Sequence, residues 1–462
     1  MNTDIRRWFL TAALGLALVL SLARPVSAAD ALSWRTNDSR VTASFKDAKL
    51  PAVLERMAYA TGWQIFLEPS TKREITTKFK DLPSGEALHL LLGDLNYALV
   101  PQPQGPSRFY VFRTTRQNAT ERIDPSKIAA EAAKSKIIPN ELVVRLKPGA
   151  KIDDLARLLG AKVVGKIDGL NAYRLRFDTE DATDAARIQL AASPDVASVE
   201  NNFSIDRPPT PESVPGSSVP PPQLTVKAPS GTGRIVVGLV DTAVQPLGNG
   251  LDAFLLKQLS AAGDSQLDPN SPSHGTSMAE TMLRSLEAVT KGSTSVQILP
   301  VDVFGANANT STFDLANGIA MAVNKGANPI NLSLGSESDS ALLHQVIQDA
   351  SAQHIVFITA AGNDGKSTPF YPAAYPETLP VTAIDNGQLA SYANRASYIS
   401  LGAPGTSVVY FNGQPYIVQG TSPSAAFISG MASGYMDLTH SGVDKVPAFL
   451  QQNFGIKIVP AK

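Results

Sequence analysis

Four polar residues in the second half of the chain lie where a predicted strand ends or a predicted helix begins. They are Asp241, His274, Asn363 and Ser422. A hydroxyl becomes a strong nucleophile when an imidazole oriented by a carboxylate takes its proton, and a side-chain amide can donate to the oxyanion that then forms. Each residue alone also has an ordinary structural explanation, such as a turn, a helix cap or a core histidine. The chemistry is therefore predicted from the four residues together.

Two of the four have a local context that suits a reaction. The chain has five histidines, and only His274 is followed by Gly-Thr at the start of a predicted helix. Ser422 stands at the start of a small-residue helix, where unpaired N–H groups and the helix dipole favour an oxyanion. Gly420 allows a tight turn before it, and we expect Pro423 at the first helical position, where its missing N–H costs nothing.

The elements that must position these side chains form a repeating pattern from residue 233 onward. Apolar strands are predicted at 234–240, 296–301, 329–333, 355–360 and 379–383. Helices are predicted between and after them, at 276–290, 312–325, 338–353 and 423–437. The strands lack hydrophobic–polar alternation, which favours an α/β fold with a parallel sheet covered by helices on both faces. In such sheets the reactive groups lie at the carboxyl ends of the strands.

The order and spacing of the four residues make the prediction more specific. His274 follows Asp241 by 33 residues and Ser422 follows His274 by 148, with Asn363 between them. This is the Asp, His, Ser order of the subtilisin type. Over residues 233–440 the chain resembles the subtilase family through six strings that occur in order: VVGLVDTAV, HGTSMAE, INLSLGS, AAGNDG, LGAPGTSV and GTSPSAA.

The resemblance implies a role for each residue. Ser422 would attack the scissile carbonyl, His274 would take and return the proton, and Asp241 would orient the imidazole. The Asn363 amide and the backbone N–H of Ser422 would hold the oxyanion. The two backbone walls of the first specificity pocket would be Ser333, Leu334 and Gly335 on one side and Ala360, Ala361 and Gly362 on the other. Their small side chains suit an extended peptide bound through its main chain.

Some features depart from the family pattern. The nucleophile motif of the family usually continues Ser-Met-Ala, whereas Pro423, Ser424 and Ala425 follow Ser422 here. The block 233–462 is also compact for the family. Calcium is common in the family, but no acidic loop of this chain has the composition of a calcium site. The sequence identifies no cofactor and no calcium site, although calcium stays possible by family resemblance and calcium dependence is left open.

A first small block, residues 40–114, alternates short strands with two amphipathic helices. The stretches VTASFKDAKLPAVLERMAYATGWQIFLEPS and ITTKFKDLPSGEALHLLLGDLNYALV resemble the short N-terminal (STN) domain of secretins and TonB-dependent receptors. The resemblance implies contact with a protein partner of the cell envelope and no catalysis. A generic α+β domain is the alternative.

A second small block, residues 137–206, has the predicted order β-α-β-β-α-β of a ferredoxin-like domain. Its stretches ELVVRLKPGA and DVASVENN, and its position just before the predicted catalytic block, resemble the inhibitory propeptide of subtilases. The resemblance implies an intramolecular inhibitor. Linkers are predicted at 115–136 and at 207–232, and the prolines of the second disfavour cleavage at many of its bonds.

The N-terminus predicts export. A basic start precedes the apolar run 8–23 and a small-residue exit, so residues 1–28 are predicted to be a signal peptide cut near Ala28 or Ala29. A membrane anchor is the alternative, but the run is shorter than the roughly 20 apolar residues needed to span a bilayer. The start also weakly resembles a twin-arginine export motif. We expect a periplasmic or secreted protein without a membrane span once the signal is removed.

The composition excludes several classes of function. The 462 residues include 40 Lys and Arg against 41 Asp and Glu, and a net charge of −1 gives no reason to expect a nucleic-acid partner. The sequence contains no cysteine, which excludes disulfides, thiolate metal sites and a cysteine nucleophile.

The sequence therefore predicts an exported serine endopeptidase that cleaves proteins or peptides and is made as a self-inhibited zymogen. The alternative is a catalytically weak or inactive subtilase-fold scaffold that binds peptides or envelope partners. An esterase or lipase is disfavoured, because the Gly-x-Ser-x-Gly elbow and the Ser, Asp, His order of that fold are missing. Substrate preference, the processing site and the oligomeric state are left open.

Overall fold

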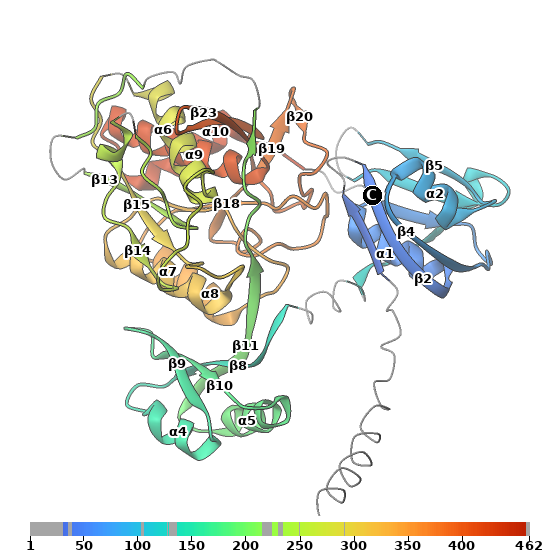
Figure 1. Ribbon diagram of the computed structural model, residues 1–462, viewed down its shortest axis with the longest axis horizontal. Helices are drawn as coiled ribbons and strands as arrows, with labels where there is room; N and C mark the ends of the chain where they lie inside the picture. The colour runs from blue at the N-terminus through green and yellow to red at the C-terminus, as the bar shows by residue number, and fades with distance from the viewer. Residues whose placement is uncertain are drawn as a thin grey trace, which may run out of the picture.

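The computed structural model describes residues 31–35, 39–102, 106–126, 128, 136–214, 224–229, 234–248, 250–290 and 292–458. Three units follow one another along the chain. We call them the N-terminal domain (31–126), the middle domain (136–206) and the C-terminal domain (234–458). Figure 1 shows the N-terminal domain in blue and the middle domain in teal and green, each as a separate unit beside the larger C-terminal domain. The predicted signal peptide and parts of both linkers lie outside the described residues.

The N-terminal domain packs two helices against two small sheets. One sheet has the order β1-β2-β4, made of Ala31–Arg35, Arg40–Lys49 and Glu74–Pro83. The other has the order β5-β6-β3-β7, made of Asn96–Val100, Arg108–Phe112, Gln64–Leu67 and Glu121–Arg122. Strands β1 and β7 lie outside the expected range 40–114, so this folded unit is longer at both ends than the sequence suggested.

Helix α1 (Leu50–Thr61) of this domain buries the apolar residues whose spacing predicted it, and α2 (Ser84–Leu92) packs beside it. Pro51, in the first turn, lacks an N–H that would have no acceptor there, so proline fits that position. The helix ends at Gly62, which adopts φ 68° and donates its N–H to the carbonyl of Ala58. Glycine meets no Cβ clash in this left-handed conformation, so α1 ends in a defined direction.

The middle domain has the predicted order of strands and helices. Its elements are β8 (Ile137–Leu146), α4 (Ile152–Leu159), β9 (Lys162–Ile167), β10 (Ala172–Arg176), α5 (Glu180–Ala192) and β11 (Val196–Asp206). The four strands form one antiparallel sheet in the order β11-β8-β10-β9. Strand β11 continues beyond this sheet and pairs with β16 (Asn309–Ser311) of the C-terminal domain.

The C-terminal domain is built on a parallel sheet, as the sequence predicted. The strand order is β14-β15-β13-β17-β18-β19, with β21 beside β19 and β20 as an antiparallel addition. The strands are β13 (Ile235–Asp241), β14 (Leu259–Ser260), β15 (Val296–Asp302), β17 (Ile330–Leu332), β18 (Phe357–Ala360), β19 (Thr378–Asp385), β20 (Gln388–Leu389) and β21 (Leu401–Pro404). The third strand in this order, β13, carries Asp241 at its carboxyl end.

Helices cover both faces of this sheet. The helices are α6 (His274–Val289), α7 (Thr312–Asn324), α8 (Ala341–Ser351), α9 (Thr421–Thr439) and α10 (Val446–Phe454). Buried side chains of α7 and α8 pack with Val240, Leu332 and Phe357 on one face. Those of α6 and α9 pack with residues such as Leu239 and Ile358 on the other face. Successive strand residues point to opposite faces, which explains why the strands are apolar throughout.

One sequence prediction about α9 was wrong. The helix begins at Thr421, with Gly420 as its N-cap, so Pro423 is the third helical residue and not the first. The helix tolerates proline at this position because no N–H of the first turn has an acceptor inside the helix. Ser422 is consequently part of the first helical turn rather than of the turn before it.

The chain between the middle and C-terminal domains crosses the C-terminal domain. After β11 leaves β16, the strand β12 (Glu212–Ser213) pairs with β23 (Gln414–Gln419), which forms a hairpin with β22 (Thr406–Phe411). Pro211, just before β12, is buried. Figure 1 shows this green stretch running along the C-terminal domain. Among the described residues, no helix is both long and apolar enough to cross a membrane.

Candidate active site

Asp241 and His274 form a buried pair at the carboxyl edge of the sheet. The Nδ1 atom of His274 lies 2.8 Å from Oδ1 and 3.0 Å from Oδ2 of Asp241. Both side chains are almost completely shielded from solvent. The backbone N–H of Thr242 also donates to Asp241 Oδ1, at 2.6 Å. An imidazole bonded in this way keeps Nδ1–H toward the carboxylate and leaves Nε2 free to accept a proton.

A second buried carboxylate lies beside this pair without competing for the imidazole. Asp302 ends β15 directly opposite Asp241 on the neighbouring strand. Its Oδ1 accepts the N–H groups of Phe304 and Gly305, and its Oδ2 accepts the hydroxyl of Ser265. All these donors are turn or loop groups, so Asp302 holds the loop after β15 and Asp241 alone faces His274.

Helices α6 and α9 lie against each other through two glycines of α9. A Cβ on Gly430 would lie 2.3 Å from the carbonyl oxygen of Met282, and one on Gly434 would lie 3.3 Å from Cδ1 of Leu286. Only residues without a side chain allow the helices to come this close. The contact advances by one turn in the same direction on both helices, so α6 and α9 are parallel.

This arrangement brings Ser422 and His274 to the same end of the helix pair. The nearest neighbours of Gly430 and Gly434 on α6 are Ser285 and Val289, one turn apart, so the two helices run in the same direction. Ser422 and His274 each lie in the first turn of their helix. Two parallel helices that begin at His274 and Thr421 therefore carry the imidazole and the hydroxyl at the same end of the helix pair.

The hydroxyl of Ser422 is hydrogen-bonded to Ser333 rather than to His274 in this structure. It donates to the carbonyl oxygen of Ser333 at 3.1 Å, and the Ser333 hydroxyl donates in return to the carbonyl oxygen of Ser422 at 3.1 Å. Asn331 of β17 donates to the Ser333 hydroxyl at 2.9 Å and accepts from Ser429 of α9 at 3.0 Å. This buried chain of bonds ties the start of α9 to β17. The serine–histidine hydrogen bond of a triad requires Ser422 to rotate about its Cα–Cβ bond.

Asn363 is held in place by the residue before Ser422. The backbone N–H and the hydroxyl of Thr421 both donate to Oδ1 of Asn363, at 2.8 and 2.9 Å. Because a backbone N–H can only donate, the oxygen of the amide must face Thr421 and the NH2 group must point away from it. The Asn363 side chain is exposed and its NH2 group is available to an acceptor.

The two predicted wall segments lie on opposite sides of one aromatic ring. A Cβ on Gly335 would lie 2.6 Å from Cε1 of Phe370, and one on Gly362 would lie 3.1 Å from Cγ of the same ring. Ser336 pairs with Tyr371 through two backbone hydrogen bonds, which fixes Phe370 beside the first wall. The structure therefore brings the segments 333–335 and 360–362 together around Phe370.

The middle domain contacts the C-terminal domain at the N-termini of two helices. Glu200 accepts the Ser340 hydroxyl at 2.9 Å and the N–H groups of Ala341 and Leu342, at 2.6 and 3.0 Å, at the start of α8. Burial raises the pKa of Glu200, and these hydrogen bonds oppose the rise. A carboxylate in this position satisfies otherwise unpaired N–H groups and the positive end of the helix dipole.

Asn202 makes the corresponding contact with α7. Its Oδ1 accepts the N–H of Phe313 at 3.2 Å, while its own amide donates to Glu141 at 2.8 Å. Arg174 of β10 forms an ion pair with Asp314 at 2.9 Å. Burial raises the pKa of Asp314, although Arg174 opposes the rise. The middle domain is thus bonded to both helices that cover one face of the sheet.

Among the described residues, no three His, Asp or Glu side chains are grouped so that they could hold a metal ion. The groups available for chemistry are the four side chains singled out from the sequence and the N–H groups at the start of α9.

Sequence reasoning missed the residues that orient these groups. Thr421 donates to Asn363, and Asn331 and Ser429 belong to the series of hydrogen bonds that fixes Ser422. In the sequence, each of the three resembles an ordinary helix or strand residue. Only Thr421 gave a signal that could have been used, since a hydroxyl at the first position of a helix is free to bond outside it.

Comparisons with known proteins agree with this geometry. Residues 232–442 match the Subtilase family, and residues 123–202 match the Fervidolysin N-terminal prodomain family. Subtilisin Savinase of Lederbergia lenta is 31% identical over 227 residues, which cover 47% of this chain and 83% of that protein. M-protease of Shouchella clausii is 31% identical over 227 residues, which cover 47% of this chain and 59% of M-protease. The thermophilic serine proteinase of Bacillus sp. is 29% identical, covering 43% and 51%. The chain thus spans just over half the length of the last two relatives.

Solved structures with low sequence identity share the fold. Fervidolysin from Fervidobacterium pennivorans, described as a keratinolytic enzyme related to subtilisin, has a TM-score of 0.53 at 19% identity, covering 66% of this chain and 56% of its own. A mutant of the epidermin leader peptide processing serine protease from Staphylococcus aureus has a TM-score of 0.51 at 16% identity, covering 68% and 93%. Together with the match to subtilisin Savinase, the fold and the matched residues lead to one conclusion: this chain belongs to the subtilase family.

Proposed function

We propose that the protein is a serine endopeptidase of the subtilisin type that is made as a self-inhibited zymogen. The observation that carries the proposal is the buried hydrogen bond between His274 and Asp241, with Ser422 in the first turn of the parallel helix α9.

The reaction divides between these residues as follows. Ser422 rotates its hydroxyl from Ser333 to His274, which takes the proton as Oγ attacks the scissile carbonyl carbon. The Asn363 NH2 group and the N–H of Ser422 donate to the resulting oxyanion. His274 then gives its proton to the leaving amine, and the acyl-enzyme is hydrolysed by a water that His274 activates in the same way. Asp241 stabilises the imidazolium throughout.

The inhibited state follows from the path of the chain. Strand β11 pairs with β16 and ends at Asp206, which lines a cavity together with Gly335 and Ser336 of one wall segment. An extended peptide substrate would bind between such edges through its main chain. These contacts support the proposal that the end of the middle domain takes the place of the acyl side of a substrate, so that the intact chain blocks its own cleft.

Export and the partner of the N-terminal domain belong to this proposal as well. The signal-like start of the sequence supports a periplasmic or secreted location, and the STN-like sequence pattern supports contact with a protein of the cell envelope. Both rest on sequence pattern alone. Detection of the mature protein outside the cytoplasm, with its new N-terminus near Ala29, is the direct test of export.

The experiment that tests the proposed activity combines one variant and one probe. We expect a fluorophosphonate to label the wild-type protein at Ser422 and to leave Ser422→Ala unlabelled. We also expect Ser422→Ala to accumulate as a full-length precursor without peptidase activity. Ser424→Ala is the matched control, because Ser424 lies in the same helical turn and donates to Pro404 at 2.9 Å. A folded wild-type protein that the probe does not label would instead support the inactive, peptide-binding scaffold.

A further inference from the structure

The tip of helix α1 in the N-terminal domain touches the backbone of the C-terminal domain next to Asn363. A Cβ on Gly62 would lie 1.8 Å from the carbonyl oxygen of Gly365 and 2.7 Å from Cα of Lys366. Two backbones approach this closely only where one residue has no side chain, and Gly62 also needs its positive φ of 68° to end α1. The contact therefore involves a specific backbone position on each domain.

A phenol, a carboxylate and an ammonium group form the side-chain part of the same contact. The Tyr59 hydroxyl of α1 donates to Glu337, and Lys366 lies 2.7 Å from the same carboxylate. The Lys366 Nζ also lies 3.6 Å from the centroid of the Tyr59 ring, a cation–π contact. Lys366 is only 9% exposed. Tyr59 thus helps remove a charged pair of the C-terminal domain from water while giving that pair a donor and an aromatic face.

The position of this contact relates it to the proposed cleft. Glu337 follows the wall residue Gly335 by two positions, and Lys366 follows Asn363 by three. Tyr59 therefore bridges the two segments that carry the walls and the oxyanion donor. A cavity of about 220 Å³ lies at this point and is lined by Tyr59 as well as by Gly335, Asp364, Phe370 and the end of β11.

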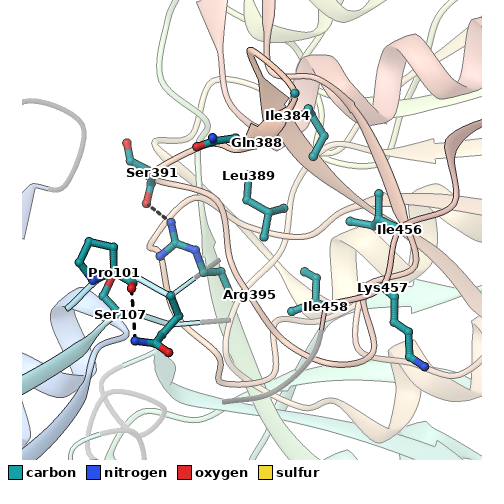
Figure 2. Close-up of a pocket in the computed structure, with 12 residues that line it drawn as sticks. Pro101, Ser107, Ile384, Gln388, Leu389, Ser391, Arg395, Ile456, Lys457 and Ile458 are labelled. Carbon is teal, nitrogen blue, oxygen red and sulfur yellow. Dashed lines mark hydrogen bonds between the residues drawn. The ribbon is translucent and has the colours of Figure 1, made fainter. Parts of the chain in front are cut away.

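The two domains also face each other across a second, larger cavity. Figure 2 shows a larger cavity, of about 620 Å³, between Pro101 and Ser107 of the N-terminal domain and Arg395, Leu389 and Ile458 of the C-terminal domain. The hydrogen bond from Tyr59 to Glu337 and the cation–π contact of Tyr59 with Lys366 lie instead at the tip of α1.

We propose that the N-terminal domain is a fixed wall of the substrate cleft, and that its partner at the tip of α1 is the C-terminal domain of the same chain. The role in the cleft rests on the proposed peptidase function, whereas the docking itself does not. The domain closes the cavity beside Gly335 and Asn363, so a substrate that reaches this cavity contacts Tyr59. The contacts of Gly62 and Tyr59 lie in neither linker, so they persist after cuts within 115–136 and 207–232 release the middle domain.

Docking can be tested without activity because the chain has no cysteine of its own. Ser126 and Ser367 are exposed and line one cavity of about 280 Å³ at the domain boundary. We expect the double variant Ser126→Cys and Ser367→Cys, in the Ser422→Ala background, to be joined by a short bismaleimide, with the linked peptides identified by mass spectrometry. Ser126→Cys paired with Ser293→Cys is the control, because Ser293 precedes β15 at the opposite edge of the sheet. Equal linking of both pairs, or linking of neither, overturns the proposed docking.

The role in the cleft is tested on the processed enzyme. We expect the N-terminal domain, once cut from the middle domain within 115–136, to co-elute with the C-terminal domain, and its complete separation overturns the proposal. Loss of the Tyr59 hydroxyl in Tyr59→Phe should raise KM for an oligopeptide about two- to tenfold and leave kcat nearly unchanged, because the bond to Glu337 holds the wall in place for ground and transition states alike. Tyr110→Phe, whose ring stacks on Phe66 within the N-terminal domain, should leave both constants unchanged.

The outcomes separate this proposal from the proposed function. An unchanged KM in Tyr59→Phe overturns the role as a wall while leaving the peptidase intact. A wild-type protein that is not labelled at Ser422 removes the peptidase and with it the wall, and the cross-linking result then decides the docking alone. Gly62→Val, which adds a Cβ against Gly365, should abolish the specific cross-link if the variant folds, and Tyr59→Phe provides the test if it does not.

Discussion

The middle and N-terminal domains meet the C-terminal domain in two different ways. Glu200 and Asn202 of the middle domain bond to backbone N–H groups at the starts of α8 and α7, and strand β11 adds main-chain pairing with β16. The N-terminal domain instead presents one phenol and one glycine to a loop, with cavities on either side. The middle domain is thus held by hydrogen bonds with fixed directions. The contact of the N-terminal domain depends on a few atoms at the tip of one helix.

This difference shows how the two contacts should respond to change. Backbone N–H groups cannot move without moving α7 and α8, which are packed into the core, so the middle domain fits in one register only. A loop and an ion pair can adjust more easily. We therefore expect the contact of the N-terminal domain to influence substrate binding rather than the folding of the protein. The predictions below test this contrast, in order of decreasing effect.

The largest effect is expected from Asn363→Ala, in the loop that the N-terminal domain touches. Loss of one oxyanion donor typically lowers kcat by about 10²–10³. The contacts of the middle domain with α7 and α8 do not include this loop, so inhibition by that domain should be unchanged. Steady-state kinetics of the processed variant, together with the lag before activity appears, measures both quantities. An Asn363→Ala enzyme with normal kcat would remove this amide from the oxyanion hole.

A smaller effect is expected when one helix cap of the middle domain is removed. Asn202→Ala leaves the N–H of Phe313 without its acceptor, and losing a cap of this kind corresponds to about a tenfold weakening of the contact. Activity should therefore appear sooner after synthesis of the precursor. Asn201→Ala is the matched control, since Oδ1 of the neighbouring Asn201 has no hydrogen-bond partner among the described residues. Identical lag times in the two variants would contradict the capping role.

The smallest effect is a dependence of the middle-domain contact on pH. Burial raises the pKa of Glu200 above its ordinary value of 4.5 in the docked state, so the docked state holds this proton more tightly than the undocked state. The contact is therefore favoured at low pH and weakens as pH rises through the raised value. The carboxylate of Asp314, whose pKa burial also raises, acts in the same direction.

We expect hydrogen exchange of the paired amides of β11 in the Ser422→Ala precursor to be slower at pH 5 than at pH 7, after correction for intrinsic rates. The difference should shrink in Glu200→Ala, which has no carboxyl group to titrate at this position. Protection that increases with pH would reverse the sign and contradict the proposed linkage.

The sequence was sufficient for the parts of the site that local chemistry defines. Asp241 and His274 could be predicted because a polar residue at the end of an apolar strand or at the start of a helix is conspicuous, and the structure brings them together. The parallel sheet followed from strands without alternation.

Contacts between distant segments could not be predicted in the same way. The bond from Thr421 to Asn363 and the position of Gly62 against Gly365 depend on how whole elements pack, and neither leaves a periodic pattern in the sequence. Strand β1 was missed for a similar reason, since a five-residue segment is defined as a strand only by its pairing with β2.

The glycine contacts between α6 and α9 fix the position of Ser422 along and around its helix relative to α6. One residue inserted into α9 between Ser422 and Gly430 would keep the helices in contact but turn the serine by about 100° around the helix axis. The hydroxyl would then face away from the imidazole, although every residue of the motif would still be present. The distance along the helix from Ser422 to Gly430 is thus as strict a requirement as the identity of the serine itself.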